Sequence, residues 1–120
     1  MGADLIIQRL RDTIKKGVFG IDYTVIPREK NRRLRREYVI SDDDIIDILS
    51  RLTSTDFVKT EPSTNEKHLN DIIAVFKKTE MLQPKWAEEA ERISVSIYIK
   101  ITWPVDELGM LIISFHEDNI

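Results

Sequence analysis

A histidine at the end of an apolar segment is the residue in this sequence that first suggests chemistry. His116 follows the segment LIISF at residues 111–115 and is one of two histidines in the chain. Imidazole gains and loses a proton near neutral pH, so it can serve as a general base or a general acid. The chain has no cysteine, which excludes disulfides, thiol catalysis and thiolate-bound zinc. The partners of His116 must therefore be sought among oxygen and nitrogen groups.

Two of these partners lie on the clearest strand pattern in the sequence. Residues 93–103, ISVSIYIKITW, carry an apolar side chain at every odd position. This alternation predicts a strand with one face in the core, and it places Tyr98 and Lys100 on the other face. Lys59 or Lys78, from earlier strand candidates, can join them there.

The same argument from parity applies to the last strand candidate, residues 110–116. Leu111, Ile113 and Phe115 share one parity, and His116 has the other. If the large apolar side chains face the core, His116 lies on the face that carries Tyr98. We therefore expect a histidine, a phenol and two or three lysines to meet on one face of a sheet.

Such a set of groups suits the cleavage of RNA without a metal. When the 2′-hydroxyl of RNA attacks the adjacent phosphate, one group must accept its proton and another must protonate the leaving 5′-oxygen. Fixed cations stabilise the negative charge that gathers in the transition state. We expect neither a metal nor a cofactor. The acidic run at 42–44 follows Ser41 and is explained as the capped start of a helix, not as a magnesium site.

A basic segment offers further contacts to phosphate. Residues 28–36, REKNRRLRR, contain six basic residues and one acid, although the whole chain has a net charge of −3. The overall charge argues mildly against a general nucleic-acid binder, yet a local basic patch remains. An exposed helix face is the alternative explanation of the segment. The residues predicted to hold RNA phosphates are Arg28, Lys30, Asn31, Arg32, Lys78 and Lys100.

The N-terminal half of the chain is predicted to be helical. Residues 3–17 form an amphipathic pattern that ends at a glycine, and residues 18–26 look extended. A helix is expected from Pro27 through Tyr38, and another follows Ser41 with Ile45, Ile48 and Leu49 on one side.

The C-terminal half is predicted to contain strands connected by hairpins. The candidates are residues 56–60, 71–79, 93–103 and 110–116, while residues 81–92 form either a long hairpin loop or a short helix. Helices followed by such strands indicate an α+β fold with the N-terminal helices packed on one face of a small antiparallel sheet. At 120 residues we expect a single domain, residues 1–120, with its helical part over about 1–52 and its strands over about 56–116.

The sequence also bears on location. No apolar run reaches the length of a membrane span, and the first residues lack the pattern of a signal peptide. We therefore expect a cytoplasmic protein without a membrane partner. Nothing in the sequence indicates whether the protein forms a homo-oligomer.

Five short motifs occur in one order from Ile26 onward. They are I-P-R-x-K-N at 26–31, L-T-x-x-D-[FY] at 52–57, V-F-x-K at 75–78, Y-[IL]-K-[IL] at 98–101 and I-S-F-H at 113–116. In these motifs the chain resembles the MqsR (motility quorum-sensing regulator) family of bacterial type II toxins. The resemblance implies a RelE-like fold, ribosome-independent cleavage of mRNA, and a cognate antitoxin protein as partner.

The resemblance also implies roles for individual residues. The positions that match the catalytic residues of the family are Lys59, Tyr98 and His116. A catalytic glutamine of the family has no clear counterpart: only His68 or Asn70 lies nearby, and Ile73 is the residue that could occupy the equivalent place. Lys77 stands where the family has glycine. A non-enzymatic binding protein or an inactive member on the same fold is the alternative that these departures leave open.

Overall fold

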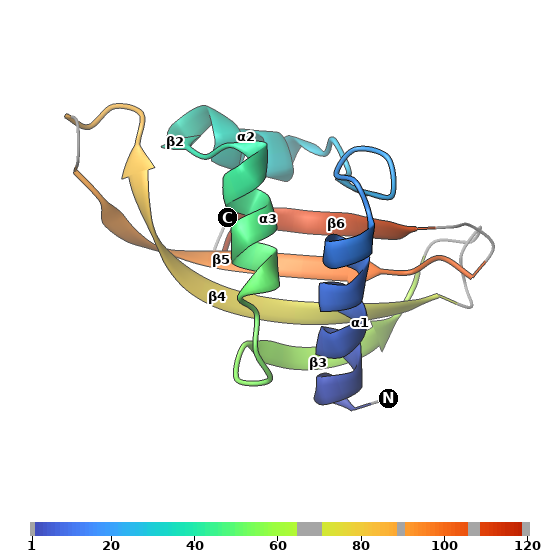
Figure 1. Ribbon diagram of the computed structural model, residues 1–120. Coiled ribbons are helices and arrows are strands. Elements are labelled where there is room, and N and C mark those ends of the chain that lie inside the picture. The colour runs from blue at the N-terminus through green and yellow to red at the C-terminus, as the bar shows by residue number, and fades with distance from the viewer. Residues whose placement is uncertain (1, 65–70, 89–90, 106–108, 119–120) are drawn as a thin grey trace.

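The computed structural model of the chain describes residues 2–64, 71–88, 91–105 and 109–118. Over these residues, three helices lie against a curled sheet of six strands (Figure 1). The predicted α+β class is therefore confirmed. Among the described residues, no helix is both long enough and apolar enough to cross a membrane.

The three helices begin and end close to the predicted positions. They are α1 (Ala3–Lys16), α2 (Glu29–Glu37) and α3 (Asp42–Ser50). Ser41 caps α3 as expected: its hydroxyl accepts a hydrogen bond from the amide of Asp44 at 3.1 Å. The carboxylate of Asp44 in turn accepts the amide of Ser41 at 2.8 Å. This reciprocal capping box explains the acidic run, because each side chain satisfies an N–H group at the helix start.

The strands form one mixed sheet. They are β1 (Tyr23–Val25), β2 (Tyr38–Val39), β3 (Phe57–Pro62), β4 (Ile72–Pro84), β5 (Ile93–Thr102) and β6 (Met110–Glu117). Their order is β1-β6-β5-β4-β2, and β3 also pairs with β4. The pairs between β3, β4, β5 and β6 are antiparallel as predicted, but β1 runs parallel to β6. The sheet is thus mixed because part of the extended segment 18–26 adds a short parallel edge.

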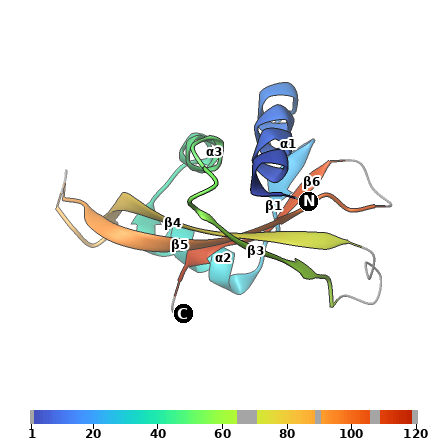
Figure 2. The same cartoon turned by 90° about the horizontal axis from the view of Figure 1, so that it is seen from below.

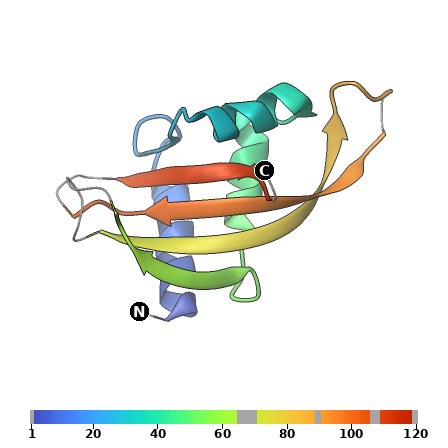
Figure 3. The same ribbon diagram turned by 180° about the vertical axis from the view of Figure 1, so that it is seen from behind.

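Helices α1 and α3 cover one face of the sheet (Figure 2). Their buried side chains, Leu10 and Leu49 among them, pack with Phe76, Ile97 and Ile99 of the central strands to form the core. Helix α2 lies beside β6 at the edge of the sheet, as the view from behind shows (Figure 3). The face of the sheet opposite α1 and α3, which we call the open face, is therefore bordered by α2.

The first half of the segment 81–92 is neither the long hairpin loop nor the short helix that the sequence predicts. Strand β4 continues to Pro84, with Met81 opposite Ser94 and Leu82 opposite Ile93 on β5. Beyond this point Gln83 pairs with β2. The long strand is stable because every one of its residues pairs with a neighbouring strand. The residues of the segment alone do not reveal such pairing.

Candidate active site

The open face brings Tyr98 and His116 together. The register places Tyr98 of β5 opposite His116 of β6, and Lys77 of β4 opposite Tyr98 on the other side. The rings of Tyr98 and His116 have their centroids 5.5 Å apart at an interplanar angle of 32°. The ammonium groups of Lys100 and Lys77 lie 5.5 and 6.0 Å from the centroid of the Tyr98 ring. The phenol ring of Tyr98 therefore lies beside His116 and has two cations near it.

A β-bulge in β6 sets which residues share this face. Ile101 pairs with Ile112 and Lys100 pairs with Ser114, so that Ile113 has no opposite residue on β5. The extra residue reverses the alternation along β6. Ile112 is buried in the core, while Ile113 lines a groove on the open face. The prediction that Leu111 and Ile113 face the core with Phe115 is therefore wrong, whereas His116, after the bulge, does lie on the open face.

The imidazole of His116 is held in one tautomer. Its Nδ1 lies 2.9 Å from the backbone carbonyl oxygen of Glu117. Since a carbonyl oxygen can only accept, Nδ1 is the donor, and in the neutral ring the lone pair is on Nε2. The half-buried ring thus presents a proton acceptor to the open face.

The end of β6 is fixed from the other face. The hydroxyl of Tyr38 donates to the carboxylate of Glu117 at 2.9 Å. Burial of the phenol and this hydrogen bond raise the pKa of Tyr38 to about 12, so it stays a donor at neutral pH. The contact ties the residue that follows His116 to the start of β2.

The lysines of the open face have carboxylate partners. The carboxylate of Glu61 bonds the ammonium of Lys100 at 2.8 Å and that of Lys59 at 3.3 Å. The bond to Lys100 lowers the pKa of Glu61 and raises the pKa of Lys100, so both are charged at neutral pH. Lys77 pairs with Asp118 at 3.3 Å. Pairs this exposed contribute about 0–1 kcal/mol, so a phosphate can replace the carboxylate.

Lys59 is distant from the histidine. It lies on β3 opposite Val75, three strands away from β6. At ~4.8 Å per strand the two backbones are separated by about 14 Å. Lys59 and His116 therefore cannot act on the same reacting atoms, and Lys59 contacts this set of residues through Glu61.

The expectation that Lys78 joins the open face is wrong. Lys78 lies opposite Ile97, a core residue, and so projects on the side of α1 and α3. Its ammonium is 3.9 Å from carboxylate oxygens of both Asp56 and Glu80. Lys77, for which no site role was expected, takes the place beside Tyr98. The signal that identifies it is the cross-strand register with β5.

Some residues of helix α2 hold the fold together, and others lie on the surface. Asn31 is only 4% exposed, and its amide donates to the carbonyls of Ile26 at 2.8 Å and Ile113 at 2.9 Å. Its oxygen accepts the backbone N–H of Phe115 at 2.9 Å. These bonds occupy the amide at the bulge, so Asn31 positions α2 against β6 while it also lines the histidine groove.

The basic residues of α2 and of its N-cap lie in different surroundings: some line a groove and others form surface ion pairs. Arg28 and Lys30 line the open face near His116, and among the described residues no carboxylate pairs with the Arg28 guanidinium. Arg32 is exposed on the helix and lies outside the lining of both grooves. The later arginines form ion pairs within the surface, namely Arg33–Glu37, Arg35–Asp42 and Arg36–Glu29. The solvated-face explanation thus holds for the second half of the segment.

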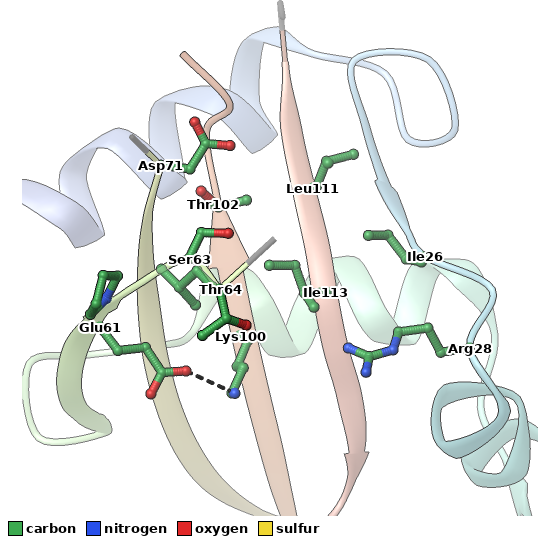
Figure 4. A pocket seen from close by; sticks show the side chains of 12 residues that line it. Ile26, Arg28, Glu61, Ser63, Thr64, Asp71, Lys100, Thr102, Leu111 and Ile113 are labelled. Atoms are coloured by element: carbon green, nitrogen blue, oxygen red, sulfur yellow. Dashed lines mark ion pairs between the residues drawn. The ribbon is translucent and has the colours of Figure 1, made fainter. Parts of the chain in front are cut away.

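Two adjoining grooves hollow the open face. The smaller, of about 500 Å³, is lined by His116, Tyr98 and Ser114, and we call it the histidine groove. The larger, of about 770 Å³, is lined mainly by residues of β3, β4, β5 and β6, and we call it the aliphatic groove (Figure 4). Arg28 and Lys100 line both grooves. The surface is therefore one continuous concavity with two cations at its centre.

No cluster of three or more metal-binding side chains occurs among the residues that the structure describes. His68 and Asn70, the residues nearest the missing glutamine of the resembled family, lie outside the described residues. Comparison of the chain with protein-family models, with curated proteins and with solved structures found no match.

Proposed function

We propose that the protein is an endoribonuclease that cleaves mRNA by attack of a 2′-hydroxyl on the adjacent phosphate. The observation that carries this proposal is the pairing of His116 with Tyr98, whose ring lies near the ammonium groups of Lys77 and Lys100. With the motif resemblance it also supports a toxin of a bacterial type II toxin–antitoxin pair, acting in the cytoplasm and restrained by a cognate antitoxin.

Each group has a step in the reaction. Nε2 of His116 accepts the proton of the 2′-hydroxyl, and the 2′-oxygen forms a bond to phosphorus. The bond from phosphorus to the 5′-oxygen breaks, and the leaving oxygen takes a proton from the hydroxyl of Tyr98. The imidazolium then returns its proton to the phenolate through water. Lys77 and Lys100 stabilise the negative charge on the non-bridging oxygens of the transition state.

The remaining cations suit the neighbouring phosphates of an RNA strand. Arg28 and Lys30 border the histidine groove, and Lys59 lies beyond Glu61. Contacts of this kind make binding depend on salt, because each neutralised phosphate releases counterions. We therefore expect affinity for RNA to fall as ionic strength rises.

A non-enzymatic binding protein is the second candidate. The carboxylates of Glu61 and Asp118 already neutralise lysines on the open face, and such a face attracts RNA less strongly. This function predicts binding of a protein partner with no cleavage of RNA.

The two functions are separated by incubating the purified protein with end-labelled single-stranded RNA in the presence of EDTA. We expect products with a 2′,3′-cyclic phosphate and a 5′-hydroxyl, at a rate that EDTA leaves unchanged, because every step above uses side chains. Growth arrest on induced expression in a bacterial host is the matching cellular result. Absence of both cleavage and growth arrest contradicts the nuclease.

A matched pair of substitutions on β4 tests which face carries the chemistry. Lys77→Ala is expected to lower the cleavage rate about tenfold, the effect of removing ~1.4 kcal/mol of charge stabilisation from the transition state. Lys78→Ala is expected to leave the rate within about twofold, because Lys78 projects from the opposite face. The measurement is the initial rate on one RNA for both variants. A larger loss for Lys78→Ala than for Lys77→Ala contradicts the assignment.

A further inference from the structure

The aliphatic groove differs in chemistry from the rest of the open face. Its surface is formed by Ile73 of β4 and by Leu111 and Ile113 of β6, with Ile26 at one side (Figure 4). All four side chains are partly exposed to solvent. Their neighbours on the same strands are the lysines and aromatic groups of the histidine groove, so the apolar surface is confined to one end of the face.

Polar groups surround this apolar surface. Glu61, Ser63 and Thr64, at the end of β3 and just after it, line the side opposite Ile113 (Figure 4). Arg28 and Lys100 stand at the border with the histidine groove. The groove thus combines an apolar base, a polar rim and a cationic entrance on the side of His116.

This combination defines the ligand that fits. A planar group with apolar faces and a polar edge, attached to an anion, matches this apolar base, polar rim and cationic entrance. A nucleobase with its phosphate has this chemistry, since unpaired bases pack by their faces on apolar or aromatic side chains and are recognised at their edges. The volume of about 770 Å³ lies within the range of ~300–1,000 Å³ typical of small-ligand sites.

We propose that the aliphatic groove binds the nucleobase next to the scissile phosphate and sets the base preference of cleavage. The scissile phosphate stays with Lys77 and Lys100, and the adjoining phosphate lies at Arg28. The base packs on Ile73 and Ile113 with its edge toward Ser63 and Thr64. This inference rests on the proposed nuclease activity. It adds a specificity subsite whose apolar surface lies apart from His116 and Tyr98.

The test compares two probes and two variants. One probe is a 2′-O-methyl hexanucleotide of the cleaved sequence, which cannot be cut, and the other is its abasic counterpart with the same number of phosphates. Ile73→Ala removes part of the apolar surface. Ile72→Ala is the matched control, because Ile72 is the preceding residue, is 59% exposed and projects from the opposite face.

Affinities are measured by fluorescence anisotropy. We expect the native protein to bind the hexanucleotide more tightly than the abasic probe. Ile73→Ala should weaken binding of the hexanucleotide about fivefold to tenfold and leave the abasic probe unchanged, and Ile72→Ala should change neither. Mapping of cleavage sites should show a relaxed base preference for Ile73→Ala alone.

The outcomes separate the subsite from the nuclease. Equal affinity of the native protein for both probes, or an unchanged affinity and base preference in Ile73→Ala, overturns the subsite while cleavage itself continues. If the native protein neither cuts RNA nor binds either probe, the nuclease and the subsite fail together. A thermal melt of each variant confirms that it is folded before binding is compared.

Discussion

Replacement of His116 by alanine is expected to lower the rate of RNA cleavage by about 10²–10⁴-fold, the contribution of a positioned general base. The expectation rests on the contact of Nδ1 with the carbonyl of Glu117, which leaves Nε2 as the acceptor of a ring that lines the histidine groove. The measurement is the single-turnover rate on a short RNA with saturating protein. In a bacterial host, the same substitution should abolish growth arrest.

Two controls distinguish chemistry from folding in this experiment. Ser114→Ala alters the neighbouring residue of β6 on the same face and should retain most of the rate, because the hydroxyl has no step in the reaction. Added imidazole should restore part of the activity of His116→Ala, since it supplies the missing proton acceptor. Full activity in His116→Ala, or a loss that imidazole does not change in a folded protein, contradicts the assignment of the base.

The juxtaposition of Tyr98 and His116 could be predicted from the sequence because both lie on strands with regular patterns. The alternation from Ile93 to Thr102 fixes the face of Tyr98 without knowledge of its partners. The face of His116 was predicted correctly although the assignment of Leu111 and Ile113 was not. Phe115 and His116 both follow the bulge and are adjacent, so the core position of Phe115 is enough to place His116 on the open face.

Lys77, and not Lys78, lies beside Tyr98. The motif V-F-x-K does not show which of the two lysines faces that side of the sheet. In the sequence both lysines follow Phe76, and each can be assigned to either face if the strand is assumed to start elsewhere. The core position of Phe76 opposite Ile99 decides the matter, since it places Lys78 with the core and Lys77 beside Tyr98. A one-residue change in assumed phase reverses every side chain of a strand.

Long-range pairing accounts for the remaining differences. The parallel pairing of β1 with β6 joins segments more than 80 residues apart, and so do the bonds from Asn31 to the backbone of β6. Nothing in the residues near Asn31 distinguishes an asparagine that holds a bulge from one that contacts a phosphate. Its type and its place in a basic helix favoured the second role, but its burial assigns the first.

Replacement of Asn31 by alanine is expected to lower the free energy of unfolding by about 2–4 kcal/mol. The substitution leaves the N–H of Phe115 and the carbonyl of Ile113 without their partner in a buried site, and each such group costs about 1–3 kcal/mol. The measurement is urea unfolding followed by circular dichroism. Arg32→Ala is the control on the same helix, and its exposed side chain should matter by less than about 0.5 kcal/mol.

Asn31→Asp separates the two halves of this interaction. The new carboxyl keeps an acceptor for Phe115, but in its charged form it faces the carbonyls of Ile26 and Ile113 without a proton to donate. The pKa of this carboxyl should therefore be raised above the ~3.9 of the unfolded chain. A raised pKa means that stability is fully present below pH ~3.9 and is lost as the pH rises through the folded value. The difference in stability between native protein and variant should thus widen from acid to neutral pH.

The same variants connect the fold to the chemistry. Asn31 bonds to the backbone of the bulged residue Ile113 and of Phe115 just after it, and the bulge sets the direction of the strand that ends in His116. Asn31→Ala should therefore lower the cleavage rate at temperatures where the protein is still folded, while Arg32→Ala leaves the rate of the bound complex unchanged. Normal stability and normal single-turnover cleavage in Asn31→Ala would show that the bulge holds its shape without the amide of Asn31.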